Sequence, residues 1–445
     1  MRTHRIGSRP HIQGSCAPLR LCGRAGGITD GAGLVLLRHL WDRLDVGAWL
    51  DSRTRGIAGV FRPSLMLEIL VALLWYGGGA LDHVSWLGPR NIRRIFGWVS
   101  VPDPTTFGRW LRRAGEALVP LLDQLLWHIV VLRWRVVGVP ERVTLLLDST
   151  VSVRYGQKQA GAEVGYNPKK HGRPSHHPMV AFLQETGDCA GERWRPGNAH
   201  TADGAIEWLE LLVVRLRAAG VSEITVRLDK GFFSRAMVNA LQELGVSFLL
   251  KVPDYPWLRR QLGARRQSEK DPAIWTASGT LYGVRLLSCE WRKALLTEQG
   301  TLRLDTYEVT QRAHVLTNLE GIHALTAWRL YNQGAVVEQR IAELGQLAVG
   351  DTAIDHLEGN ALLWQIGALA YQLLHYTRTT ALPGDWQRAQ PERLRAALLR
   401  MPAKLTTHSR KHSLRIASDE PQRHTLRSAL SHLARLAVPP LPRAA

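Results

Sequence analysis

Two apolar segments of the chain end in the same way, and this pairing constrains the fold more than any other feature. "LLLDST" (145–150) and "VRLDKGFFS" (226–234) each run from apolar residues into an aspartate, which a Ser or Gly turn follows. A carboxylate at the end of a buried strand is costly to desolvate. Each aspartate alone either forms the turn or is held there to bind a strongly positive group.

The elements around these segments indicate a mixed sheet. The predicted order is three strands, helix, strand, helix and strand, which is the order of a ribonuclease-H-like five-stranded sheet. In such a sheet the ends of neighbouring strands lie side by side, so Asp148 and Asp229 are expected to meet. The strands are predicted at 142–148, 179–185, 191–197, 223–229 and 246–253, with a further short one at 151–156, and the helices at 201–220 and 234–245.

Two carboxylates at contact distance repel each other and raise each other's pKa unless a cation lies between them. A divalent metal ion is the natural occupant of such a site. Mg²⁺ prefers oxygen ligands and keeps coordination positions open for water and phosphate. The pair, in this element order, therefore favours a metal site over two unrelated turn formers.

A third acid is expected on a helix predicted at about 326–348. Glu338 lies beside the apolar stripe of this helix and can reach the end of the sheet, whereas Glu343, the competing choice, is predicted to face solvent. The stripe has the spacing of a helix that packs on a sheet and consists of Leu330, Val337, Ile341 and Leu344.

The charge balance points to nucleic acid. The chain of 445 residues has 57 Lys and Arg against 38 Asp and Glu, a formal net charge of +19, and it contains 16 Trp. Such an excess favours a nucleic-acid partner over small metabolites, with a merely soluble basic protein as the alternative. The long apolar stretches are short for a membrane span and carry charge, so no membrane partner is expected.

The cysteines predict a reducing, cytoplasmic setting. Their spacing fits neither a disulfide framework nor a structural zinc site. The basic N-terminus has no apolar core and is not a secretory signal. The four cysteines are Cys16, Cys22, Cys189 and Cys289.

The first third of the chain has helical periodicity and is predicted to form an all-α DNA-binding domain. "VPDPTTFGRWLRRAGEAL" (101–118) is typical of a turn, a Thr cap and an Arg-bearing helix. Arg109, Arg112 and Arg113 on this helix are candidates for DNA contact, with an ordinary solvated helix face as the alternative. The predicted divisions are a flexible basic N-terminus at 1–29, the helical domain at 30–139, the catalytic domain at 140–253 and 321–378 around a β-rich insertion at 254–320, and a basic C-terminal region at 379–445 that ends without structure.

These motifs together resemble the DDE transposases of bacterial insertion sequences, in the class whose third acid lies in a Tyr-Arg-Glu-Lys signature helix. The matching residues are Asp148, Asp229 and, in "YNQGAVVEQRIAELG", Glu338. "DPTTFGRWL", "GYNPKKHGRPSHHPMVAFL" and "RPGNAHTADGA" also resemble this group, and the similarity covers roughly residues 30 to 415.

The resemblance implies a ribonuclease-H-like catalytic domain, two divalent ions (Mg²⁺ or Mn²⁺) and double-stranded DNA partners. Members cut the inverted-repeat ends of their own element and join the freed 3′-OH to target DNA, and a homodimer is expected in the DNA complex. We assign Asp148 to bridge both ions, with Asp229 and Glu338 each completing one. The signature tyrosine, Tyr331, is expected to contact DNA.

One departure from the signature concerns its two basic residues. Gly334 and Gly345 stand where the Arg and the Lys are expected, on the helix face of Glu338. Arg340 projects away from Glu338 and cannot replace them. Either basic residues elsewhere, with Lys169, Lys170, Arg173 and Lys230 as candidates, hold the phosphates, or this copy cleaves poorly.

Other polar and aromatic residues have weaker claims. Ser149, Thr150 and Lys230 either orient the acids or phosphate, or serve the turns. "NPKKHGRP" (167–174) is predicted to contact the DNA backbone, whereas Asn198, His200 and Asp203 are predicted to cap the helix that follows. The resemblance makes Trp257, Trp275 and Trp291 in the insertion candidates for stacking on an extruded base, with core packing as the alternative.

The leading prediction is therefore a cut-and-paste transposase. Two alternatives remain, a stand-alone ribonuclease-H-like nuclease and a catalytically weak DNA-binding repressor of the element. DNA cleavage with Mg²⁺ separates an enzyme from a binding protein.

Overall fold

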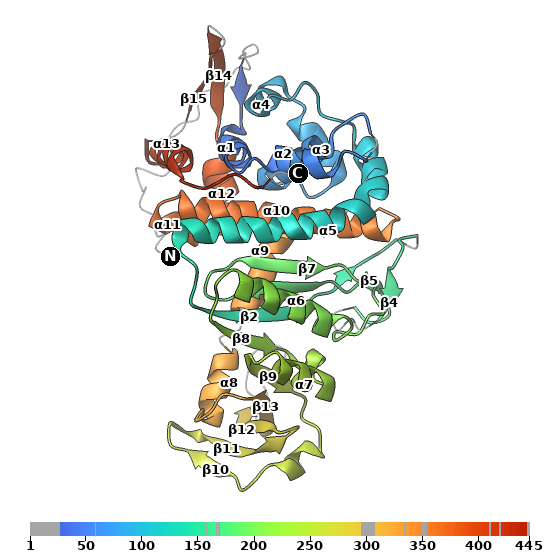
Figure 1. Ribbon diagram of the computed structural model, residues 1–445, viewed down its shortest axis with the longest axis vertical. Coiled ribbons are helices and arrows are strands. Elements are labelled where there is room, and N and C mark those ends of the chain that lie inside the picture. The colour runs from blue at the N-terminus through green and yellow to red at the C-terminus, as the bar shows by residue number, and fades with distance from the viewer. Residues whose placement is uncertain are drawn as a thin grey trace, which may run out of the picture.

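The structure is a computed structural model in which the elements stack in layers along the long axis (Figure 1). Helices of the N-terminal and C-terminal regions form one end, two long helices lie side by side below them, and a large sheet with its flanking helices continues to the other end. The structure describes residues 27–57, 59–156, 158–165, 167, 170–294, 308–332, 335–348, 354–408, 411–417 and 420–442.

Within the described ranges, the central sheet has nine strands in the order β10-β11-β12-β13-β9-β8-β2-β6-β7. Strands β2, β8 and β9 are parallel to one another, and β6 runs antiparallel to both of its neighbours, β2 and β7. The strands that the sequence predicts for the catalytic domain are all present, with helices between them in the predicted order. Their bounds are β2 (Arg142–Ser149), β6 (Met179–Leu183), β7 (Cys189–Arg193), α6 (Ala205–Ala218), β8 (Glu223–Leu228), α7 (Arg235–Glu243) and β9 (Ser247–Val252).

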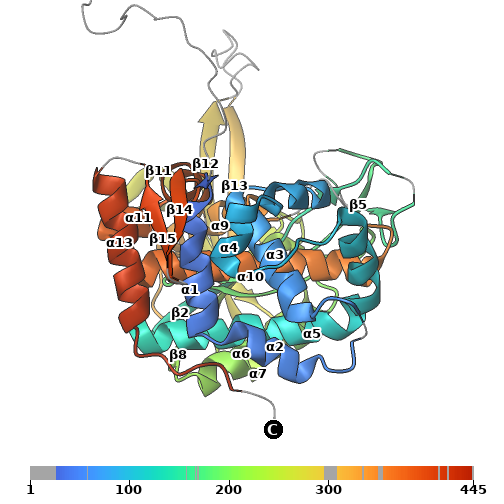
Figure 2. The same ribbon diagram turned by 90° about the horizontal axis from the view of Figure 1, so that it is seen from above.

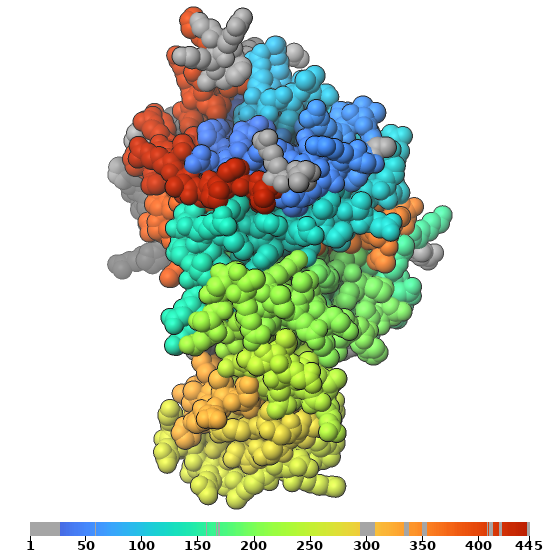
Figure 3. Space-filling view, viewed as in Figure 1, coloured from blue at the N-terminus to red at the C-terminus, as the bar shows by residue number. Residues whose placement is uncertain are grey.

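The insertion does not form a separate body but extends this sheet. Strand β13 pairs antiparallel with β9, so the sheet is wider than the five strands predicted from the sequence. Figure 3 shows the insertion as the narrow end of the molecule, beside α8 (Ala324–Asn332). Its elements are η4 (Leu258–Gln261), β10 (Arg266–Ser268), β11 (Asp271–Leu281), β12 (Val284–Ala294) and β13 (Glu308–Thr317).

Alternating residues of the sheet enter two separate cores, as the period of two along a strand requires. On β6, Val180 and Phe182 face the long helices α5 (Pro104–Val137) and α10 (Leu357–Thr380), and the Phe182 ring lies 5.5 Å from that of Tyr371 on α10. Met179, Ala181 and Leu183 face the other way, toward α6 and α7. The segment predicted as a strand at 151–156 contributes only β3 (Ser152–Val153), which joins β4 (Glu163–Val164) and β5 (Pro174–His176) in a small separate sheet.

The predicted N-terminal helical domain shares one core with α10 and the C-terminal region. Trp75 on α3 donates its indole N–H to the Ala370 carbonyl of α10 at 3.0 Å. Figure 2 shows α1 and α13 side by side above α10, and β14 pairs with the N-terminal strand β1. The elements here are β1 (Ile28–Thr29), η1 (Ala32–Leu34), α1 (Val35–Arg43), α2 (Val46–Arg53), α3 (Pro63–Tyr76), η2 (Leu81–Leu87) and α4 (Arg90–Phe96).

The C-terminal region forms helices and strands within its described residues, 379–408, 411–417 and 420–442, whereas the last residues, 443–445, lie outside the described residues. Its apolar residues Leu426, Ala429 and Leu433 on α13 join the core around α1. Burial of these side chains supplies the free energy that a polar tail lacks. The elements are α11 (Gly384–Gln387), α12 (Pro391–Leu394), the π-helical turn η5 (Arg395–Leu399), β14 (Ala403–His408), β15 (Lys411–Ile416) and α13 (Glu420–Arg435).

Helix α5 corrects the prediction for residues 101–118. It is one helix of 34 residues that continues through Pro120, and its cap is Asp103, whose carboxylate accepts from the Thr105 backbone N–H at 2.8 Å. By length and composition α5 could cross a membrane, but half of its most apolar window is buried inside the protein, as in a core helix. The arginine-bearing start of α5 is therefore the first part of a core helix and not a short independent recognition helix.

The single helix predicted at 326–348 is two helices, α8 and α9 (Ala335–Gly345). Helix α8 packs on the insertion strands, where Leu325 and Ala327 are buried. Helix α9 instead packs with Leu344 against the core of the long helices. The predicted continuous apolar stripe therefore serves two different cores, and the side chain of Val337 and residues 333–334 lie outside the described residues.

Candidate active site

The two predicted aspartates lie in one row across the sheet. Leu147 of β2 pairs with Leu228 of β8 in parallel register, so the next residue on each strand is an aspartate, Asp148 and Asp229. Both leucines face the core under α6 and α7. Because side chains alternate along a strand, both aspartates are directed to the opposite face, on which α9 and α10 lie.

Glu338 completes this cluster from α9. Its exposed side chain lies in the first turn of the helix, and it lines a cavity of about 290 Å³ together with Asp148 and Asp229. The structure thus brings together the three acids that the sequence singled out. The other residues of this cavity are Leu146, Leu147, Arg227, Leu228, Lys251, Tyr331 and Asn332.

Glu343 is buried, which corrects the prediction that it faces solvent. It accepts hydrogen bonds of 2.9 Å from Arg378 of α10 and from Arg340 one turn earlier on α9. Its side chain is 1% exposed and is not part of the acid cavity. Glu343 is therefore a structural ion-pair partner, and Arg340 points toward it, consistent with the prediction that Arg340 projects away from Glu338.

The electrostatics of Asp148 reflect this crowding. Burial, with a smaller contribution from the nearby charges of Asp229 and Glu338, raises the pKa of Asp148 to about 6 against the lowering effect of the Ser149 N–H. That N–H donates to the Asp148 Oδ1 at 2.7 Å. The Tyr331 hydroxyl donates to the Asp229 Oδ1 at 3.1 Å, and burial together with Asp229 raises the pKa of Tyr331.

The donor set of the cavity fits a divalent metal ion. Its three acids offer oxygen ligands alone, as Mg²⁺ and Mn²⁺ prefer, and within the described part of the chain none of them is in an ion pair with a Lys or Arg. Among those same residues no three His, Cys, Asp or Glu side chains are grouped closely enough to hold one ion.

A second, larger cavity of about 830 Å³ opens on the other side of the aspartates. Asp148 and Asp229 line both cavities, so the pair lies at their junction. The predicted flanking residues Ser149 and Lys230 also line the larger cavity. Its remaining lining comes from Val164, Gly165, His177, Asn198, Ala199, His200, Thr201, Ala202, Gly231, Phe232 and Pro253.

His177 connects this cavity to Asp148. Its Nδ1 lies 2.9 Å from the Ala199 carbonyl oxygen, which can only accept, so Nδ1 carries the proton. The Nε2 therefore accepts from the Ser149 hydroxyl at 3.1 Å. Burial lowers the pKa of His177 and keeps the ring neutral. Ser149 is fixed in this way from its side chain, while its backbone N–H holds Asp148.

Three residues of the site were missed from the sequence, namely Arg227, Lys251 and His177. For two of them the sequence contained a pattern that could have identified them. Arg227 stands two positions before Asp229, hence on the same face of β8, and Lys251 is the one charge within the apolar strand β9. His177 carries no comparable signal, because its contact with Ser149 depends on the antiparallel pairing of β6 with β2, in which Ser149 lies opposite Met179.

The basic residues predicted to bind DNA lie in different places. The exposed Lys170 and Arg173 surround the exposed ring of Tyr155, with the Lys170 ammonium 4.8 Å and the Arg173 guanidinium carbon 5.7 Å from its centroid. Lys169 lies outside the described residues. Arg109, Arg112 and Arg113 are exposed at the start of α5, where Arg112 pairs with Asp355 at 2.6 Å.

The structure also shows the positions of the residues predicted to cap α6, of Thr150 beside the acids, and of Gly345. Gly204 and not Asn198, His200 or Asp203 occupies the cap position of α6, and Asp203 instead accepts from the His200 backbone N–H at 2.8 Å. Thr150 donates its backbone N–H to the Pro178 carbonyl. Gly345 is exposed and ends α9, whereas Gly334 lies outside the described residues.

The three tryptophans proposed for base stacking do not line either cavity at the acids. Trp291 packs against Trp328 with ring centroids 4.8 Å apart, which is ordinary core packing. Trp257 is exposed and stacks on Tyr255 at 5.9 Å. Trp275 is exposed at the rim of a cavity of about 280 Å³ in the insertion.

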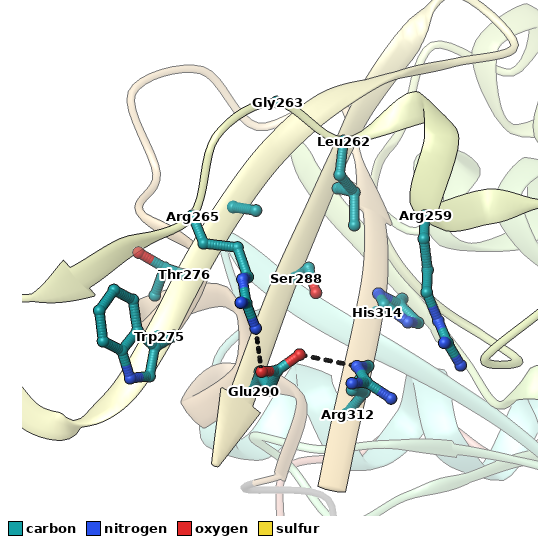
Figure 4. A pocket seen from close by; sticks show the side chains of 11 residues that line it. Arg259, Leu262, Gly263, Arg265, Trp275, Thr276, Ser288, Glu290, Arg312 and His314 are labelled. Atoms are coloured by element: carbon teal, nitrogen blue, oxygen red, sulfur yellow. Dashed lines mark hydrogen bonds and ion pairs between the residues drawn. The ribbon is translucent and has the colours of Figure 1, made fainter. Parts of the chain in front are cut away.

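Figure 4 shows that insertion cavity. Glu290 lies between Arg265 and Arg312 and accepts hydrogen bonds from both, at 2.7 Å from Arg312. Trp275 lies beside Arg265, and Arg259 lies across the cavity. The arrangement combines an exposed ring with arginines, so stacking by Trp275 stays a prediction.

Comparison with known proteins shows the family of the chain. The model of a transposase domain matches residues 19–438, nearly the whole chain. The chain belongs to the family described as "Transposase DDE domain group 1". A search of curated proteins finds no match. Among solved structures, the piggyBac transposase synaptic complex with hairpin DNA is similar to this chain at 13% identity and a TM-score of 0.43, over 92% of this chain and 86% of that chain.

Proposed function

We propose that this DDE transposase binds the inverted-repeat ends of its own insertion sequence, cuts them, and joins the freed 3′-OH to target DNA. The observation that carries the proposal is the placement of Asp148, Asp229 and Glu338 around one cavity. Family membership supports a DNA-cutting and DNA-joining enzyme. The catalytic domain is proposed to be ribonuclease-H-like, which the strand order β7-β6-β2-β8-β9 supports.

The three acids would hold divalent metal ions. When bound, a pair of such ions activates the attacking oxygen and stabilises the leaving oxygen of an in-line displacement at phosphorus. The chain's own residues position the carboxylates for this task. The Ser149 N–H fixes Asp148, and the Tyr331 hydroxyl fixes Asp229. No protein nucleophile is required, because water and then the 3′-OH attack.

DNA is the partner that the charge supports. A net charge of +19 favours binding to the phosphate backbone, which supplies most of the sequence-independent affinity. We propose a homodimer on paired element ends, in the cytoplasm of a bacterium. Lys170, Arg173 and Lys230 are the described candidates for backbone contacts, together with Arg109 and Arg113.

The experiment is a cleavage assay with purified protein. A supercoiled plasmid carrying the DNA that borders the gene is incubated with Mg²⁺, and the products are mapped by sequencing. The proposal predicts cuts at the borders of inverted repeats and 3′ ends joined to new DNA. Binding without cleavage, as expected of a repressor, or cleavage without joining, as expected of a nuclease, would contradict it.

A further inference from the structure

The cavity at the acids is also lined by two basic side chains, Arg227 and Lys251. We propose that these two residues bind the phosphate of the DNA strand that is being cut. The inference rests on the proposed function and deepens it, because it names the cations that position the substrate at the three acids.

Lys251 lies in the same row as the two aspartates. Leu228 of β8 pairs with Leu250 of β9, as it does with Leu147 of β2, so the next residues on the three strands are Asp148, Asp229 and Lys251. Neighbouring strands lie about 4.8 Å apart. The backbone of Lys251 is therefore one strand spacing beyond Asp229. Leu250 faces the core under α7, so Lys251 is directed to the face of the acids.

Arg227 lies directly behind this row on β8. It is 6% exposed, and its Nη1 donates to the Leu330 carbonyl at 3.2 Å. Its Nη2 is buried and has no hydrogen-bond partner in the part of the chain that the structure describes. Buried charged groups are ordinarily paired, because an unused donor costs the desolvation free energy. A phosphate oxygen in the cavity would satisfy it, and the guanidinium fork suits phosphate geometry.

Lys251 is held near the acids by an aromatic contact and not by an ion pair. Its Nζ lies 5.3 Å from the ring centroid of Tyr331, the residue whose hydroxyl donates to Asp229. Within the described residues Lys251 takes part in no ion pair. The ammonium therefore remains available for an incoming anion while the ring limits its freedom.

The charge balance of the cavity supports a phosphate ligand. Three carboxylates carry −3, and two divalent ions would bring +4, leaving +1 for a phosphodiester that gains negative charge in the transition state. Arg227 and Lys251 raise this balance to +3. Helix α9 offers no cation at its end, because Gly345 stands there with open space around its Cβ position. The sheet supplies the cations instead.

The test uses Lys251→Met and Arg227→Met, with Arg227→Lys as the conservative variant. The exposed Lys270→Met, next to β11 in the insertion, is the matched control. Binding of the metal-free protein to a fluorescein-labelled duplex carrying one inverted repeat is measured against salt concentration. Each lost phosphate contact makes the slope of log K against log salt shallower by about 0.9. Lys251→Met and Arg227→Met should show this change, whereas Arg227→Lys and Lys270→Met should not.

A second arm measures single-turnover cleavage with Mg²⁺ of duplexes in which a neutral methylphosphonate replaces one phosphate at or beside the cut. In wild-type protein, a methylphosphonate at one such position should lower the cleavage rate about tenfold or more. Lys251→Met should cleave normal DNA about tenfold more slowly than wild type does, and the methylphosphonate at that position should slow this variant little further. The inference would be overturned if Lys251→Met and Arg227→Met showed the same salt dependence of binding as wild type, and if the methylphosphonate slowed Lys251→Met as much as it slows wild type.

The experiment remains informative if Arg227→Met is unstable or if the wild-type protein does not cut DNA. If Arg227→Met lowers the melting temperature strongly, Lys251→Met and Arg227→Lys, which keeps the charge, carry the test. If wild-type protein binds the duplex but does not cut it, the proposed function fails. The salt slopes then still decide whether Arg227 and Lys251 contact phosphate.

Discussion

The Tyr331 hydroxyl donates a hydrogen bond of 3.1 Å to the Asp229 carboxylate across 102 positions of the chain. This bond ties the end of α8 to the end of β8, next to Asp148. Hydrogen bonds to a charged partner contribute about 1.5–3 kcal/mol. The bond thus places the signature tyrosine in a role at the acids, and its predicted DNA contact stays a prediction.

Tyr331→Phe removes this bond but keeps the ring next to Lys251. We expect cleavage to slow by roughly tenfold, because Asp229 loses the partner that orients it. DNA affinity should change less than twofold if the hydroxyl serves Asp229 alone. Single-turnover cleavage and anisotropy binding on the same duplex measure the two effects. A loss confined to binding would assign the hydroxyl to DNA.

Asp148→Asn is expected to stabilise the metal-free protein at neutral pH. The folded-state pKa of Asp148, about 6, lies above its ordinary value of 3.8, so the folded chain binds this proton more readily than the unfolded chain does. The buried charge therefore costs roughly 2–3 kcal/mol above pH 6, and this cost disappears as the pH falls toward 4. The side-chain oxygen of Asn can still accept from the Ser149 N–H.

Thermal melts in EDTA at several pH values check this expectation. The variant should melt a few degrees above wild type at pH 7.5, and the difference should shrink toward pH 4.5. A lower melting temperature at pH 7.5 would mean that Asp148 is stabilised in a way that its surroundings do not indicate.

Glu338→Gln and Glu343→Gln should separate function from stability. Glu338 is exposed in the acid cavity, so its variant should fold like wild type and lose cleavage by a factor of 100 or more, on the order of a lost metal ligand. Glu343 is buried between Arg340 and Arg378. Removing one partner of a buried ion pair costs about 3–5 kcal/mol. Urea unfolding measures the stability of both variants, and a cleavage assay measures their activity. Normal activity in Glu338→Gln and a stable but inactive Glu343→Gln would make Glu343 the third acid.

His177 variants test the chain of contacts to Asp148. The amide of Gln can reach the position of Nε2 and accept from Ser149, whereas the shorter Asn can reach that of Nδ1 and donate to Ala199. We therefore expect His177→Gln to keep more cleavage activity than His177→Asn. Ser149→Ala should lower activity alone but add little to His177→Asn, since both break one contact. If the losses of cleavage activity add up in the double variant, Ser149 and His177 act independently of each other.

Gly345→Lys tests whether a cation at the end of α9 matters for cleavage. A Cβ at this exposed position meets no atom within 4 Å, so the substitution should fold normally. Because Arg227 and Lys251 already supply positive charge, cleavage should stay within about twofold of wild type. In the Lys251→Met background the same change should restore part of the lost rate. A gain of tenfold in the otherwise wild-type protein would mean that the phosphate lacks cations in this chain.

The sequence predicted the sheet and its acids because strand periodicity and strand-end aspartates are local signals. Asp148 and Asp229 are adjacent because β2 and β8 are neighbouring parallel strands, which the element order implies. Strands β10 to β13 lie within the range predicted for the insertion, but the pairing of β13 with β9 was not foreseen, since strand partners are set by contacts between distant segments.

The helix of the third acid shows where periodicity misleads. Leu330, Ile341 and Leu344 fit one helical stripe, yet they belong to two helices that pack on different cores. Glu343 was predicted to face solvent from its angular position on one continuous helix, but the structure buries it beside a charged partner. That partner is Arg378, which comes from α10 and could not be matched to Glu343 from spacing within α9.

The most direct test of the central claim is metal-specific rescue of the aspartates. Asp148→Cys and Asp229→Cys place a sulfur ligand where a hard oxygen ligand is proposed, and Mn²⁺ accepts sulfur more readily than Mg²⁺ does. Cleavage of the plasmid carrying the bordering repeats should be lost with Mg²⁺ and partly regained with Mn²⁺, while wild type cuts with either ion and not in EDTA. Full activity of both variants with Mg²⁺, or wild-type cleavage in EDTA, would contradict a metal site at these acids.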